Sequence, residues 1–161
     1  MTGKPTVRFL FQHPAHFVAL GFGAGLAPAA PGTFGTLAAI PIALLLGAYS
    51  SETAFVATIV VLFVLGTWAA QVTGKALRAA DHGSIVIDEV AAFLLVLYFA
   101  GLTPLRIAIA FALFRFFDIV KPPPIRQLDA ALKNGLGVML DDMLAALYAL
   151  VVFAVGQRVI G

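Results

Sequence analysis

Residues 54–72 read AFVATIVVLFVLGTWAAQV and contain no charged side chain. An α-helix rises about 1.5 Å per residue, so about 20 apolar residues cross the hydrocarbon core of a bilayer. The stretch therefore predicts a membrane-spanning helix. The composition of all 161 residues agrees, because 61% are hydrophobic and only 11% are charged, against about 25% charged in a typical soluble domain. So few charges would not cover the water-facing surface of a soluble protein of this size.

Apolar segments on both sides of this stretch predict further spans. The first apolar block is interrupted by proline and glycine, at Pro28, Pro31, Gly32 and Gly35. Irregular backbone at membrane depth persists only where protein or a water-filled cavity satisfies it, so we expect a re-entrant or broken element over 17–35. Spans are predicted over 36–49, 54–72, 85–100, 105–120 and 137–160. The prediction is an all-α polytopic membrane helical bundle, with a cytoplasmic lead-in at 1–16 and a single membrane-embedded domain at 17–161.

The charged residues indicate the orientation of these spans. A cytoplasmic N-terminus places most Lys and Arg residues in cytoplasmic segments, as the positive-inside rule requires; these residues are Lys4, Arg8, Lys75, Arg78, Lys121, Arg126 and Lys133. The acidic residues play no part in this topology, yet it brings nearly all of them to the same face: Asp81, Asp88, Glu89, Asp118, Asp129, Asp141 and Asp142. Only Glu52 falls on the opposite side.

Five of these acids lie within or at the ends of predicted spans: Asp88, Glu89, Asp118, Asp141 and Asp142. A charged side chain inside a span is unfavourable by a few kcal/mol, so acids there are functional by default. Carboxylates are hard oxygen ligands that suit Mg²⁺. Zinc is less well suited, because the chain has no cysteine and its three histidines have no paired ligand spacing. The alternative is that the acids lie in headgroup water or pair with neighbouring Arg and Lys residues.

Basic residues near these acids are candidates for holding a phosphate. Arg115 and Asp118 are three residues apart and share a helix face, and so are Asp118 and Lys121. Arg126 and Asp129 have the same spacing. Arg can bind phosphate through two parallel hydrogen bonds, whereas Lys acts as a point charge. A divalent cation and phosphate-binding groups at bilayer depth together predict metal-assisted phosphoryl chemistry on a phospholipid headgroup.

Two further segments have a functional and a structural interpretation. The glycine-rich turn predicted at residues 31–35 precedes an apolar helix, where backbone N–H groups can bind phosphate; the alternative is a helix break required by packing. His82 either assists proton transfer or is simply solvated in its loop.

Four motifs, in order along the chain, resemble the bacterial phosphatidylglycerophosphatase A family. They are residues 21–26 (GFGAGL) leading into 31–37 (PGTFGTL), 81–89 (DHGSIVIDE), 114–129 (FRFFDIVKPPPIRQLD) and 135–142 (GLGVMLDD). The resemblance implies a Mg²⁺-dependent enzyme of the bacterial inner membrane, with its site facing the cytoplasm. It also implies hydrolysis of phosphatidylglycerophosphate to phosphatidylglycerol and phosphate. One departure is His13-Pro14, where the family usually has Asn-Pro.

The resemblance, the topology and the spacing together give a hypothesis for the site. The expected metal ligands are Asp88, Glu89, Asp118 and Asp142. The expected phosphate-binding groups are Arg115, Lys121, Arg126 and the backbone from Thr33 to Gly35. Asp129 and Asp141 are expected to orient water, complete a second metal site or act as nucleophile, and His82 to assist proton transfer.

Two other classes of protein share some of these features. Broken apolar segments and intramembrane acids also occur in transporters and channels, although transporter sites lie near the bilayer midplane and between inverted repeats. CDP-alcohol phosphotransferases also use clustered acids with Mg²⁺. Their pattern Asp-x-x-Asp-Gly followed by Asp-x-x-x-Asp is not found in this sequence.

Overall fold

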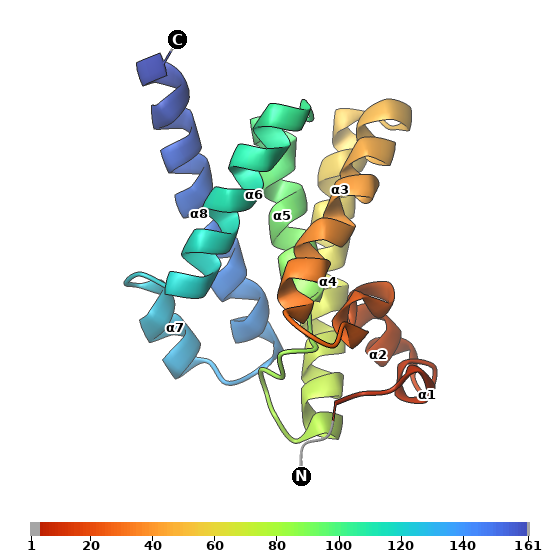
Figure 1. The fold of residues 1–161 in the computed structure, drawn as a ribbon. Helices are drawn as coiled ribbons and strands as arrows, with labels where there is room; N and C mark the ends of the chain where they lie inside the picture. The colour runs from red at the N-terminus through yellow and green to blue at the C-terminus, as the bar shows by residue number, and fades with distance from the viewer. Residues whose placement is uncertain (1–3, 161) are drawn as a thin grey trace.

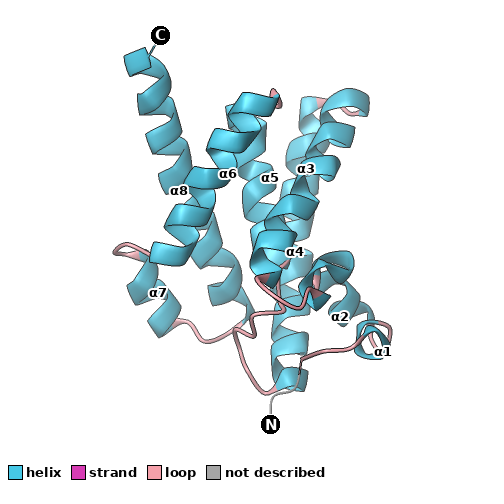
Figure 2. Cartoon of the chain, viewed as in Figure 1, coloured by secondary structure: helices cyan, strands magenta, loops and turns pink. Residues whose placement is uncertain are grey.

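Proline and serine residues define where three of the long helices begin. Pro31 and Pro104 occupy the first positions of their helices, where the missing N–H of proline is not needed. The Ser51 side chain accepts a hydrogen bond from the Ala54 N–H and so caps a third helix. The computed structural model describes residues 4–160, and its elements in that range are all helical (Figures 1 and 2). They are α1 (Val7–Leu10), α2 (Pro14–Ala19), the 3₁₀ helix η1 (Gly21–Leu26), α3 (Pro31–Tyr49), α4 (Glu52–Leu77), α5 (Ile87–Ala100), α6 (Pro104–Val120), α7 (Ile125–Ala131) and α8 (Gly135–Ile160). The predicted all-α class is confirmed.

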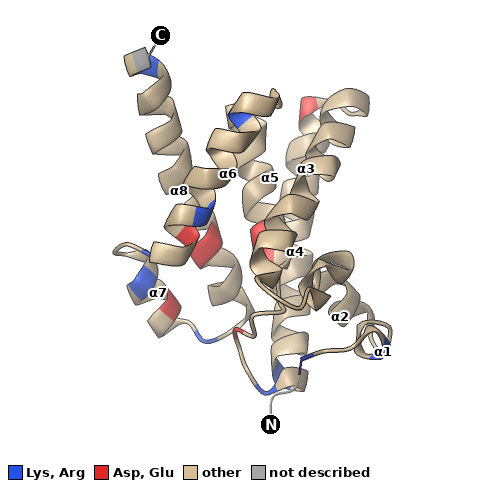
Figure 3. Cartoon of the chain, viewed as in Figure 1, with Lys and Arg blue, Asp and Glu red and all other residues tan. Residues whose placement is uncertain are grey.

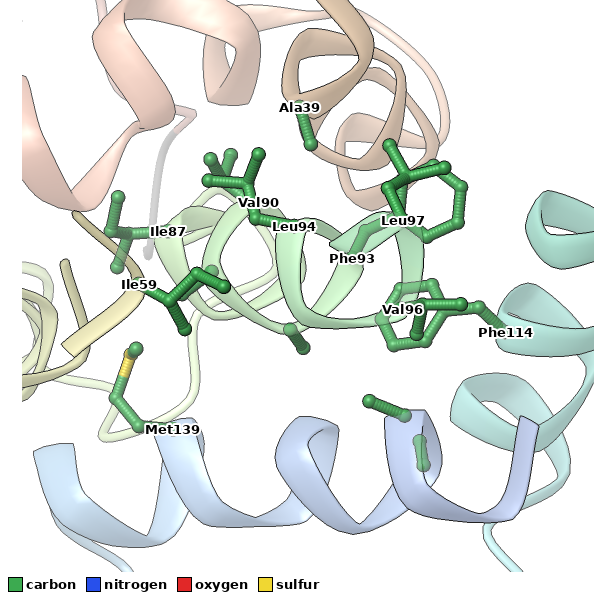
Figure 4. Close-up of a cluster of buried hydrophobic side chains, with 14 of the residues drawn as sticks. Ala39, Ile59, Ile87, Val90, Phe93, Leu94, Val96, Leu97, Phe114 and Met139 are labelled. Carbon is green, nitrogen blue, oxygen red and sulfur yellow. The ribbon is translucent and has the colours of Figure 1, made fainter. Parts of the chain in front are cut away.

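Helix α5 forms the centre of the bundle. It packs against α3, α4, α6 and α8, and most of its side chains are buried. Figure 4 shows Ala39 of α3, Phe114 of α6 and Met139 of α8 around Phe93 and its neighbours on α5. Buried alanines on several of these helices allow their backbones to approach closely, which is how helices associate in membranes. The core therefore lies around the helix that carries the first two acids of the predicted site.

Three helices in the described part of the chain, α3, α4 and α8, are long and apolar enough to cross a membrane. Helices α5 and α6 are shorter, with 14 and 17 residues. The end of α3, the start of α4 and the end of α5 meet at one end of the bundle, where they line a common cavity. Because α4 rises about 39 Å and α5 only about 21 Å, the first turn of α5 lies about 18 Å inside the opposite end of α4. The chain between α4 and α5 enters the bundle to reach that turn (Figure 2).

The N-terminal broken element is confirmed as a break, but its predicted end is wrong. Helix α3 begins at Pro31, five residues before the expected span at 36. Ala30 adopts a left-handed conformation with φ of 47°, and its carbonyl accepts the Thr33 N–H at 2.9 Å. Proline at the first helical position favours the helix, so Pro31 and Gly32 begin α3 where the sequence suggested a turn.

The first described helices pack onto the bundle. Helix α2 contacts α4, with Ala15 and His16 buried. The His16 Nδ1 lies 2.9 Å from Thr73 Oγ1 of α4, and its ring stacks on Phe9. Helix α2 therefore runs across residue 16, the predicted boundary between the lead-in and the membrane domain.

Candidate metal and phosphate site

The first turn of α5 brings two acids into the interior. The preceding loop is held by hydrogen bonds from the Ile85 N–H to the His82 carbonyl at 2.7 Å and from the Val86 N–H to the Ala19 carbonyl at 2.9 Å. Helix α5 then begins at Ile87, so Asp88 and Glu89 lie in its first turn. The N–H groups of a first turn have no partner within the helix, and the helix dipole favours anions there. This local structure explains how two adjacent acids are tolerated inside the bundle, in the first turn of α5.

Acids from three helices converge on this turn. Asp88, Asp141 and Asp142 form one group in which the candidate ligand oxygens lie within 4.8 Å of one another. Glu89, Asp118 and Asp142 form a second group that meets the same criterion. Asp142 of α8 belongs to both groups. Figure 3 shows the acidic segments of α5, α6 and α8 at similar height in the lower half of the bundle, and another at the far end of α4.

Several oxygens of these acids lack partners among the described residues. Asp88 Oδ1, Glu89 Oε2 and Asp142 Oδ2 are buried without a hydrogen bond. A buried carboxylate oxygen without a partner is strongly unfavourable unless something else satisfies it. Hard carboxylate oxygens are the donors that Mg²⁺ takes in proteins. The residues present therefore fit a divalent cation.

Arg115 pairs with acids of the second group, Glu89 and Asp118. Its Nη1 donates to Asp118 and lies 3.8 Å from Glu89 Oε1, while its buried Nε has no partner among the described residues. The Arg115–Asp118 pair predicted from the spacing is confirmed. The guanidinium thus retains donors for a further anion such as a phosphate.

Lys121 does not share a helix face with Asp118, although the spacing predicts that it does. It ends α6 in a left-handed conformation with φ of 46°, so its side chain leaves that face. Its Nζ instead lies 2.5 Å from Asp141 Oδ2 and 3.5 Å from Asp129 Oδ2. Burial acts to lower the pKa of Lys121, but the hydrogen bond and charge of Asp141 and then the charge of Asp129 outweigh it and raise the pKa above its ordinary value. Lys121 therefore carries a positive charge beside the acids.

The remaining predicted residues lie around these two groups. Asp129 of α7 pairs with Lys121 and with Lys133 at 3.3 Å. Arg126 is exposed and donates to the Val120 carbonyl at 3.4 Å, and it lies on α7 three residues before Asp129, as the spacing predicted. The His82 Nδ1 accepts the Ser84 N–H at 3.2 Å, within the loop. These three predicted residues thus lie outside both carboxylate groups.

The segment predicted as a phosphate-binding turn is the start of α3. The Thr33 N–H already donates to Ala30, and Gly35 is buried against the loop before α5, where an added Cβ would lie 2.7 Å from Val86 Cβ. Sequence reasoning missed the contribution of Gly32. A Cβ at Gly32 would lie 2.2 Å from Glu89 Oε1 and 3.3 Å from Arg115 Nη1, so the absence of a side chain lets α3 approach the acids. The glycine was visible in the sequence, but its neighbours on α5 and α6 were not.

The fold and the site together define a helical membrane protein with a carboxylate centre flanked by an arginine and a lysine. The sequence matches the family model described as Phosphatidylglycerophosphatase A over residues 17–157. The chain belongs to the phosphatidylglycerophosphatase A family, and it is a phosphatase.

Curated relatives agree with this assignment. The chain is 44% identical over 154 residues to a phosphatidylglycerophosphatase A of Haemophilus influenzae, covering 94% of each protein. It is 35% identical over 139 residues to the protein of that name in Escherichia coli, covering 86% of this chain and 80% of the relative. A Bacteroides thetaiotaomicron protein named putative phosphatidylinositol-3-phosphatase is 39% identical over 151 residues, covering 89% and 94% respectively. No solved structure matches the chain.

Proposed function

We propose that this protein hydrolyses phosphatidylglycerophosphate to phosphatidylglycerol and phosphate with the help of Mg²⁺. The observation that carries the proposal is a cluster of acids with buried, unpartnered oxygens on Asp88, Glu89 and Asp142. Arg115 lies beside Glu89 at this cluster, and Lys121 is held at its edge by Asp141. The acids supply ligands for a cation, and the basic residues supply charge for a phosphate. The names of the relatives point to the same substrate.

The proposed metal ligands are Asp88, Glu89, Asp118 and Asp142. A divalent cation there supplies a Lewis acid and lowers the pKa of a bound water. Arg115 would donate to the phosphate oxygens through its Nε, which is buried without a partner among the described residues. Arg126, exposed on α7, provides a further positive charge where the phosphate enters.

Asp141 serves to position Lys121 in this proposal. One of its oxygens accepts from Lys121 and the other accepts the Asp142 N–H at 3.0 Å. Asp129 supports Lys121 from α7. Because Lys121 and the Asp142 N–H both draw electron density from the Asp141 carboxylate, water is a better candidate for the nucleophile. An oxygen that accepts one hydrogen bond keeps a second lone pair, so Asp141 can still be a metal ligand. His82, in the loop before α5, is the candidate to carry a proton away to solvent.

We place the protein in the bacterial inner membrane with the site on the cytoplasmic side, where it serves phosphatidylglycerol synthesis. The distribution of basic residues supports this orientation. Lys75, Arg78, Lys121, Arg126 and Lys133 belong to the end that carries α7, whereas Arg106 and Arg158 belong to the other end.

Phosphate release by the purified full-length protein in detergent tests the proposal. We expect release from phosphatidylglycerophosphate, loss of activity with EDTA and recovery on addition of Mg²⁺. Asp88→Asn and Asp118→Asn should abolish release while the protein remains folded, whereas Glu52→Gln, at the far end of α4, serves as the matched control. Near-normal turnover by both Asn variants would contradict the site assignment.

The same assay with two other lipids tests which lipid phosphomonoester is the preferred substrate. Phosphatidic acid and phosphatidylinositol 3-phosphate are offered at equal concentration, the latter because of the name of the Bacteroides relative. Faster release from either one would contradict the proposed substrate. Ion flux into liposomes without phosphate release from any lipid would instead favour a transporter.

A further inference from the structure

The carboxylates of the site form two groups that differ in exposure. In the inner group, Asp88, Asp141 and Asp142 are only 6%, 4% and 3% exposed. In the outer group, which shares Asp142, Glu89 and Asp118 are half-buried. The two groups therefore offer one enclosed and one more accessible position, joined by a common carboxylate.

Each group has an unpartnered oxygen of its own. Asp88, whose Oδ1 is unpartnered, belongs to the inner group, and Glu89, whose Oε2 is unpartnered, belongs to the outer group. Asp142, whose Oδ2 is unpartnered, belongs to both. A cation in only one group would leave the buried oxygen of the other group without a partner among the described residues. Two cations bridged by one carboxylate would satisfy all three oxygens.

The balance of charge leads to the same number of cations. Arg115 and Lys121 are the cationic side chains paired with the acids of the two groups. Two positive charges against five carboxylates leave an excess of negative charge that a single divalent cation does not neutralise. A second divalent cation makes the centre positive and so attractive to a phosphate dianion.

We propose that the site holds two divalent cations bridged by Asp142, a resident one in the inner group and an exchangeable one in the outer group. Centres of this kind, with ions about 3.5–4 Å apart, recur in enzymes of phosphoryl transfer. The proposal deepens the proposed function, because it concerns the same site.

Arg115 competes with the exchangeable cation. The guanidinium pairs with Asp118 and lies near Glu89, so it offsets part of the negative charge of the outer group. A cation bound in the outer group would balance the charge of Asp118 in place of Arg115. The Arg115 guanidinium would then be free to bind phosphate. Loading of the outer position and capture of the phosphate are thus coupled through one side chain.

Titration of the purified full-length protein in detergent with Mn²⁺ tests the proposal by calorimetry and electron paramagnetic resonance. We expect two Mn²⁺ per chain, of unequal affinity, with a spin-coupled spectrum. Glu89→Gln and Asp118→Asn should each retain one Mn²⁺ and lose the coupling. Arg115→Met should bind the second Mn²⁺ several-fold more tightly and leave the first unchanged. Glu52→Gln is the control and should bind two.

The possible failures are distinguishable. One Mn²⁺ per chain in an active protein would overturn the two-cation proposal and leave the phosphatase function intact. Two Mn²⁺ without spin coupling would overturn the bridging role of Asp142. Two coupled Mn²⁺ in a protein that releases phosphate from no lipid would support this proposal and contradict the proposed function. Chromatography and circular dichroism of every variant ensure that only folded protein is compared, and the outer group is tested by two independent variants.

Discussion

A methyl group added at Gly32 would place a well-defined strain on the candidate site. The Cβ of Gly32→Ala would lie 2.2 Å from Glu89 Oε1, whereas ordinary contacts begin near 3.4 Å. Helix α3 also packs along α5, so the Glu89 carboxylate is the group that must move, by about 1 Å at the van der Waals limit. A misplacement of about 1 Å at a reacting centre lowers a rate by about 100-fold. We therefore expect a loss of turnover of about that size.

The stability of the fold should change little or rise. Alanine is more favourable than glycine in a helix by about 0.5–1 kcal/mol, and Gly32 lies in the first turn of α3. The assay is phosphate release from phosphatidylglycerophosphate in mixed micelles with Mg²⁺, together with thermal unfolding in the same detergent. Gly156→Ala in α8 is the matched control, because an added Cβ there meets nothing within 4 Å. A Gly32→Ala protein with wild-type turnover would refute the assignment of Glu89 to the reaction.

Three further predictions concern other contacts of the fold and site. Gly25→Ala should lower the free energy of unfolding by about 1–3 kcal/mol, as overpacking does, because its Cβ would lie 2.0 Å from the backbone oxygen of Ser84. An unchanged melting temperature would contradict this prediction. Lys121→Met should destabilise the protein in EDTA by about 3–5 kcal/mol, because it leaves a buried carboxylate without its partner, and added Mg²⁺ should restore part of the loss; equal stability in EDTA would contradict the pairing with Asp141. Burial, and then the charge of His13, lower the pKa of His16 from its ordinary 6.5, so the unfolded chain takes up a proton at a higher pH than the folded protein. Its contribution to stability is complete above pH 6.5 and declines at lower pH, and His16→Gln should flatten this decline in melting temperature.

The convergence of the acids could be predicted because antiparallel spans alternate in direction. Acids at the start of one span, the end of the next and the start of a later one must reach the same end of a bundle. This prediction needs only the positions of the apolar segments. In the structure, Asp142 lies with Asp88 in one carboxylate group and with Asp118 in the other. The pair formed by Arg115 and Asp118 could be predicted for a similar reason, because three residues nearly complete one helical turn.

Other contacts depend on backbone geometry that the pattern of residue types does not contain. Lys121 leaves the helix because its own backbone is left-handed, so it contacts Asp141 and does not share a helix face with Asp118 as the spacing predicted. Pro31 begins a helix where glycine and proline suggested a turn, because the preceding Ala30 provides the cap. The closeness of Gly32 to Glu89 joins residues of α3 and α5, and only the packed structure reveals it.

The short central helix has a consequence for how the protein is made. With 14 residues and two acids in its first turn, α5 is too short and too polar to partition into lipid as an independent segment. Its insertion therefore requires partners, and the turn from Gly101 to Thr103 joins it to α6 as a hairpin. Asp141 and Asp142 arrive only with α8, which is synthesised after α5 and α6. The candidate carboxylate site is thus completed only when α8 has joined α5 and α6, so we expect a stalled or truncated chain without α8 to lack the proposed metal site.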